Sequence, residues 1–184
     1  MKTKNILTAV IFTLVFGATS FAQKSVMVGG AAMYPNKNII ENAVNSKDHT
    51  TLVAAVKAAG LVETLEGKGP FTVFAPTNEA FNKLPKGTVE TLLKPENIKK
   101  LQTILTYHVI AGKMNASDIA KAIKMGGGKA SLKTVSGGTL TAWMKGKDLY
   151  ISDESGNKAK VTIADVNQSN GVIHVINTVL LPKS

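Results

Sequence analysis

The sequence predicts an α+β domain, because helical patterns fill its first half and strand patterns fill its second half. Between residues 38 and 125, apolar residues recur at intervals of three and four, which is typical of amphipathic helices. Beyond residue 129 the chain changes to short β-rich runs separated by turns that contain glycine. Helices and strands therefore segregate along the chain, which favours an α+β fold over alternating α/β units.

The helices expected in the first half begin near capping residues. A first helix is expected from Asn38. Asp48 or Thr50 is expected to cap a second one, and Gly60 follows it at the position that favours a left-handed residue. A short strand, 71–75, comes next.

Three further helices are expected between residues 77 and 125. Thr77 is a good N-cap for a short helix, and Pro95 lies where the first turn of the next helix tolerates proline. In that helix the apolar residues between Ile98 and His108 form one face. Ser117 is expected to cap the last helix.

The strands of the second half are expected at residues 130–135, 139–144, 149–152, 159–163 and 172–180. The last of these begins just after Asn170-Gly171, a dipeptide favoured in tight hairpin turns. Residues 172–176 are apolar at every position but one, so they predict a central strand that is covered on both faces.

The first residues predict export. Lys2 and Lys4 precede an apolar run that is shorter than the roughly 20 residues needed to span a bilayer. Ser20-Phe21-Ala22 then supplies a cleavage pattern, so residues 1–22 are interpreted as a secretory signal peptide. Residues 23–36 lack periodicity and are expected to form a flexible leader. Residues 37–183 are expected to form a single domain in the periplasm or outside the cell.

Charge and cysteine content limit the function. The chain has no cysteine, which excludes disulfides, thiolate chemistry, Cys-based metal sites and a lipidated N-terminal cysteine. All 22 basic residues are lysine. Removing the signal takes away two lysines and no acid, which lowers the net charge from +10 to +8. Such a surface attracts anionic polymers, but the lack of arginine argues against sequence-specific nucleic-acid binding. No second segment is apolar enough to form a stable membrane anchor.

Catalytic and metal motifs are missing from the sequence. The run Gly126-Gly127-Gly128-Lys129 is followed by alanine, so it does not fit a phosphate-binding loop. His49, His108 and His174 lack the spacing of zinc ligands. No serine lies in a nucleophile elbow. These observations favour a protein that is not an enzyme and that carries no cofactor or metal, although a hydrolase built from distant residues stays an alternative.

Three segments together resemble the fasciclin domain family, which includes domains of the adhesion protein periostin. The first resembles its opening signature block and contains Phe71, Thr72, Val73, Phe74, Ala75, Pro76, Thr77, Asn78 and Phe81. The second, Tyr107-His108-Val109, resembles its central Tyr-His motif. The third resembles its closing block and contains Asn170, Gly171, Val172, Ile173, His174, Val175, Ile176 and Asn177. They occur in the family's order and cover residues 37–183.

The resemblance implies a compact wedge of β-strands flanked by short helices, without enzymatic activity. It also implies adhesion to a cell-surface or matrix protein or polysaccharide, and it makes Tyr107, His108, Val109 and Ile110 the candidate interaction residues. The alternative is a binding protein for an anionic polysaccharide, lipid or small ligand. Asn177 stands where family members often have aspartate, which puts any salt bridge at that position in doubt. A direct structural role for the signature residues is the competing interpretation.

Overall fold

The computed structural model describes residues 24–183, so the predicted signal peptide lies outside the described residues. A mixed seven-stranded sheet has the order β4-β3-β9-β8-β7-β6-β5. Its strands are β3 (Phe71–Pro76), β4 (Val109–Ala111), β5 (Lys129–Lys133), β6 (Thr139–Lys145), β7 (Asp148–Ser152), β8 (Lys158–Gln168) and β9 (Gly171–Ile176). β3 and β9 pair in parallel, and the other neighbours in this sheet pair antiparallel.

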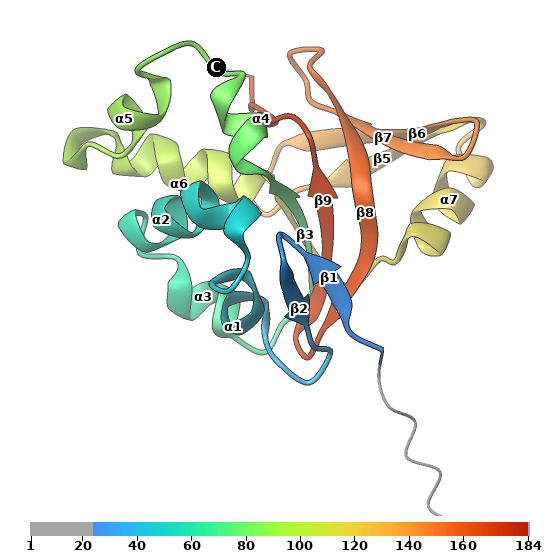
Figure 1. The fold of residues 1–184 in the computed structure, drawn as a ribbon. Coiled ribbons are helices and arrows are strands. Elements are labelled where there is room, and N and C mark those ends of the chain that lie inside the picture. Colours follow the sequence, from blue (N-terminus) through green and yellow to red (C-terminus); the bar gives the residue numbers. More distant parts are fainter. Residues whose placement is uncertain (1–23, 184) are drawn as a thin grey trace, which may run out of the picture.

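The helices are α1 (Ile39–Ala43), α2 (Thr50–Ala58), α3 (Val62–Glu66), α4 (Asn78–Asn82), α5 (Thr88–Leu92), α6 (Ile98–Tyr107) and α7 (Ala116–Met125), with 3-10 turns η1 (Lys47–His49) and η2 (Pro95–Asn97). Helices α1 to α6 gather on one side of the molecule, while α7 lies beside β5 and β6 at the other end (Figure 1). The structure confirms the α+β class. Among the described residues, no helix is long and apolar enough to cross a membrane.

The leader expected over residues 23–36 is not without structure, because most of it forms a hairpin. β1 (Val26–Val28) pairs antiparallel with β2 (Ala31–Met33), and two glycines with positive φ make the turn between them. Val28 and Met33 are each only 1% exposed. The sequence prediction failed because the hairpin is stabilised by burying these two side chains under distant elements, which leaves no local periodicity.

Of the three side-chain caps predicted for helices, one is confirmed and two differ from the structure. Thr77 caps α4 as expected, since its hydroxyl accepts a hydrogen bond from Ala80 N. Neither Asp48 nor Thr50 caps α2 with its own side chain; instead Asn78 Oδ1 accepts from Thr51 N at 3.0 Å. α7 starts one residue before Ser117. Its N-cap is Asn115, whose backbone N–H donates to the Asp118 carboxylate at 3.0 Å.

The sheet separates two hydrophobic cores. Alternate residues of β3 point to opposite faces, so Val73 and Ala75 join one core and Phe74 joins the other. We call the first the helix-side core; it includes Val56, Leu65, Val73, Leu105 and Ile173. We call the second the barrel-side core; it includes Phe74, Tyr107, Leu140, Ile151 and Ile176. β9 contributes to both, which confirms its predicted central position.

Candidate functional site

Tyr107 lies at the end of α6 and is completely buried in the barrel-side core. Its hydroxyl donates to Thr139 O at 2.9 Å and accepts from Glu154 N at 3.2 Å. Burial raises the pKa of the phenol. A Cβ at Gly138 would lie 2.5 Å from Tyr107 Cε2, so the absence of a side chain at Gly138 makes room for the ring. Tyr107 therefore joins α6 to the hairpins of the sheet.

His108 connects the end of α6 to the C-terminal segment. Its Nδ1 lies 2.8 Å from Ile104 O, and its Nε2 lies 3.0 Å from Leu180 N. Because Leu180 N can only donate, Nε2 must accept, and the ring proton is on Nδ1. Burial lowers the pKa of His108 to about 4, which keeps the imidazole neutral at physiological pH.

Val109 and Ile110 follow in β4, one in each core. Val109 belongs to the helix-side core and Ile110 to the barrel-side core, and both are buried. The structure thus brings Tyr107, His108, Val109 and Ile110 together in the interior. None of the four presents an exposed side chain, so their burial favours a structural role over direct contact with a partner.

Asn170 connects the closing block to the helices. Its Oδ1 accepts from Ile39 N at 3.0 Å, and its Nδ2 donates to the carbonyls of Leu65 and Gly67 at 2.7 and 2.9 Å. The predicted hairpin between β8 and β9 exists, but Ser169 and Asn170 form its loop and neither has positive φ. The predicted tight turn is therefore present, but its two loop residues lie one position earlier than Asn170-Gly171.

Gly171 is required for a different reason, namely the close approach of β3. Gly171 already belongs to β9, where it pairs with Phe71. A Cβ at Gly171 would lie 2.1 Å from Phe71 O, which is closer than atoms can approach. The glycine thus allows β3 and β9 to pair in parallel.

His174 and Thr72 hold the loop that follows β4. The His174 ring stacks on Phe74 with centroids 5.6 Å apart, and its Nε2 lies 2.9 Å from Met114 O. Thr72 Oγ1 donates to Gly112 O at 2.7 Å and accepts from Met114 N at 2.9 Å. Burial lowers the pKa of His174.

Asn177 accepts from Lys160 N through Oδ1 at 2.9 Å, a bond that a neutral amide oxygen can form. No ion pair involves position 177 among the described residues. The remaining signature residues also build the fold. They are Phe71, Val73, Ala75 and Pro76 of β3, Phe81 of α4, and Val172, Ile173, Val175 and Ile176 of β9.

Across residues 24–183, no three His, Asp or Glu residues lie close enough together to hold a metal ion. The three histidines have different hydrogen-bond partners. His108 and His174 bond to backbone groups, and His49 Nδ1 lies 2.9 Å from Ser46 Oγ. The bonds of His108 to Leu180 N and of His174 to Met114 O join segments that are distant in the sequence, so these two histidines connect parts of the fold.

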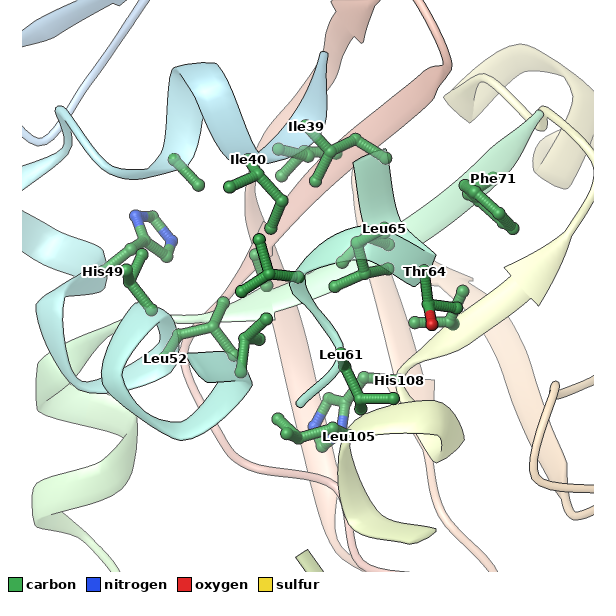
Figure 2. A pocket seen from close by; sticks show the side chains of 18 of the residues that line it. Ile39, Ile40, His49, Leu52, Leu61, Thr64, Leu65, Phe71, Leu105 and His108 are labelled. Carbon is green, nitrogen blue, oxygen red and sulfur yellow. The ribbon is translucent and has the colours of Figure 1, made fainter. Parts of the chain in front are cut away.

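A cavity of about 70 Å³ lies in the helix-side core, between α1, α2, α3, α6 and β3. Figure 2 shows His49 at one end of the lining and Phe71 with Thr64 at the other. The walls are almost entirely aliphatic or aromatic. His49 is buried, its pKa is lowered by burial, and its Nε2 has no hydrogen bond of regular geometry, although the Ala75 carbonyl is nearby.

The outer face of the hairpin strands carries a second candidate site. Strand pairing aligns Lys129 with Trp143, Trp143 with Tyr150, and Tyr150 with Lys160. The two aromatic rings stack with centroids 5.5 Å apart at 21°. We call these four residues the aromatic–lysine row. Its Lys160 is paired with Asp148, Nζ to Oδ2 at 2.7 Å.

The aromatic–lysine row was not predicted from the sequence. The alternation of the strands places Trp143 and Tyr150 on outward positions, and that signal was available. The alignment of the four side chains depends on the register of three strand pairings, which the hydrophobic pattern and the turn geometry set together.

Comparison with known proteins identifies the family. The Fasciclin domain model matches residues 47–182. The chain therefore belongs to the fasciclin domain family, as the three sequence segments indicated. A solved FAS1 domain pair from the insect cell adhesion molecule Fasciclin I superimposes with a TM-score of 0.71 at 18% identity, covering 85% of this chain and 57% of that one. This likeness shows the fold.

Relatives occur in bacteria and animals. The chain is 48% identical to protein sll1483 of Synechocystis sp., over 92% of this chain and 87% of that protein. It is 34% identical to the cell surface glycolipoprotein MPB83 of Mycobacterium bovis, over 88% and 68% respectively. It is 42% identical to transforming growth factor-beta-induced protein ig-h3 of Sus scrofa, over 71% of this chain but only 17% of that protein.

Proposed function

We propose that this chain is an exported, non-enzymatic interaction module that mediates adhesion to cell-surface or extracellular-matrix material. The observation that carries the proposal is membership of the fasciclin domain family, whose matched relatives include a cell surface glycolipoprotein and a cell adhesion molecule. The predicted signal peptide supports export to the periplasm or beyond. His108 and His174 bond to backbone groups and so have structural roles in the proposed module.

The aromatic–lysine row is the surface that supports binding best. Tryptophan and tyrosine combine a large apolar face with a polar group, and they are enriched where binding energy concentrates. Lys129 and Lys160 flank the two rings, and the exposed Lys133, Lys145 and Lys158 lie on the same four strands. A surface of this composition favours an acidic polysaccharide as the material bound.

The same lysines support the alternative, a binding protein for an anionic polymer or small ligand without adhesion. The two functions differ in salt dependence, because screening limits electrostatic attraction to about 10 Å at 0.1 M salt. Binding through shaped aromatic contacts persists when salt is added. Binding through the net charge of the lysines alone is lost.

The test measures binding of the purified protein to whole cells and to a panel of acidic and neutral polysaccharides at low and high salt. We expect saturable binding, with Trp143→Ala weakening it roughly tenfold, as for a hot-spot residue. Tyr34→Ala is the control, because Tyr34 is an exposed aromatic residue with Lys37 5.7 Å from its ring centroid, but it lies next to the N-terminal hairpin and outside the aromatic–lysine row.

Binding no stronger than that of a charge-matched unrelated protein would contradict the adhesion proposal. Binding that disappears at high salt and is insensitive to Trp143→Ala would support the alternative function.

A further inference from the structure

We propose that the cavity in the helix-side core is a binding site for a free fatty acid of medium chain length, with the carboxylate at Lys57. The site is separate from the aromatic–lysine row, since no residue that lines the cavity belongs to β5, β6, β7 or β8. The inference therefore goes beyond the proposed adhesive function.

The lining selects an apolar occupant. The deep part of the wall is formed by side chains such as Ile40, Val56, Leu65 and Leu105, which offer no hydrogen bonds. A sugar or nucleotide placed there would lose its hydrogen bonds to water without replacement, which costs several kcal/mol by general transfer data. A hydrocarbon chain has no hydrogen bonds to lose on entering, and it gains contact with the walls.

The volume of the cavity limits how much of a ligand it can enclose. A cavity of about 70 Å³ has space for roughly five to seven water-sized groups, if one probe sphere takes about 10–15 Å³. A methylene group is close to a water molecule in volume, so the enclosed part accommodates roughly six carbons of one chain. Two acyl chains together exceed that enclosed volume.

Lys57 supplies a positive charge for the carboxylate. Most of the lining residues are buried or half-buried, but Lys57, Thr64 and Val135 are exposed, so the lining includes residues that reach the surface. Lys57 forms no ion pair with any residue between 24 and 183. A carboxylate beside Lys57 would stay hydrated and meet its ammonium group, while the hydrocarbon chain extends into the apolar cavity.

The experiment titrates the purified protein with hexanoate, octanoate, decanoate and dodecanoate below their micelle concentrations, by calorimetry and by amide chemical shifts. We expect the affinity to rise roughly fourfold per methylene until the enclosed part is full, and more slowly for longer chains. Decanoate should bind more tightly than decanol, and decanol more tightly than decylamine, because Lys57 attracts the carboxylate and repels the ammonium.

Substitutions that fill the cavity test whether the ligand binds inside it. Ala43→Leu adds carbons inside the cavity and should weaken decanoate binding roughly tenfold or more, by displacing methylenes of the ligand. Ala54→Leu is the matched control, because Ala54 is exposed on α2 and does not line the cavity. Val53→Phe, at a half-buried lining position, is a second filling variant if Ala43→Leu does not fold.

Lys57→Glu should weaken decanoate binding roughly fivefold, as expected for reversal of an exposed charge, and leave decanol binding unchanged. Lys86→Glu, at an exposed position that does not line the cavity, should leave both unchanged.

Three results would overturn the proposal. The first is no binding of any monomeric fatty acid, which would make the cavity a packing void. The second is equal decanoate affinity in the wild type, Ala43→Leu and Val53→Phe. The third is binding to phosphatidylglycerol vesicles without uptake of monomeric decanoate, which would indicate docking on a membrane surface.

Discussion

The helix-side core and the barrel-side core share one sheet but are filled differently. In the barrel-side core, the large ring of Tyr107 occupies the centre and both hydrogen-bonding functions of its hydroxyl are satisfied. In the helix-side core, several short helices meet over β3 and leave a cavity, and His49 Nε2 lacks a regular partner. Strands aligned by hydrogen bonds pack side chains in fixed rows, whereas short helices joined by loops leave irregular spaces between them.

The largest expected effect is the loss of stability on alanine substitution of two residues of one helix. Tyr107 and Leu105 both lie on α6, but Tyr107 faces the filled barrel-side core and Leu105 lines the cavity. We expect Tyr107→Ala to lower the free energy of unfolding by about 4 kcal/mol, and Leu105→Ala by about 2–3 kcal/mol. Leu105 makes fewer contacts because one side of it borders empty space.

Urea unfolding of both variants measures this difference. Tyr107→Phe is the control for the hydroxyl, and it should cost about 1 kcal/mol. Equal losses for Tyr107→Ala and Leu105→Ala would show that the two cores are equally well packed.

The next effect concerns pH and His108, which lines the cavity and also bonds to Leu180 of the barrel-side core. Its pKa is about 4 in the folded protein against 6.5 for an unperturbed histidine. The unfolded chain therefore binds the proton more readily, so stability is full above pH 6.5 and declines as the pH falls toward 4. The total loss from this group is about 3 kcal/mol.

Urea unfolding between pH 7.5 and pH 4 measures the decline. His49 and His174 add to it in the same direction, since burial lowers the pKa of each. His108→Gln keeps a donor and an acceptor but does not titrate in this range. In this variant the free energy of unfolding should therefore fall less between pH 7.5 and pH 4 than in the wild type, because the contribution of His108 is gone. An unchanged slope in His108→Gln would contradict the assignment.

The smallest expected effect is the difference in stability between Ala→Leu substitutions at two positions, one in each core. Ala142 is completely buried in β6, and Ala43 of α1 lines the cavity. Ala142→Leu overfills the barrel-side core and should cost about 2 kcal/mol, whereas Ala43→Leu enters existing space and should change stability by less than about 0.5 kcal/mol. Thermal and urea unfolding of the pair measure this. A similar loss in both variants would mean that the cavity walls do not accept an additional side chain.

The sequence alone determined the class of fold and the family. Periodicity predicted the segregation of helices and strands, since it depends only on which residues alternate in burial. Local chemistry identified the cap at Thr77, because a hydroxyl and the N–H that it binds lie within one turn. Tyr107 and His108 were singled out through the resemblance, which marked their position but not whether they were exposed.

Tertiary structure decided everything that depends on contacts between distant segments. The cap on α2 comes from Asn78, the N-terminal hairpin is held by burial of Val28 and Met33, and Asn170 bonds to residues more than 100 positions away. The aromatic–lysine row depends on the register of four strands, and the cavity depends on how helices α1, α2, α3 and α6 meet β3. Such features follow from the packing of the whole chain, because no local pattern records which distant side chains will share a space.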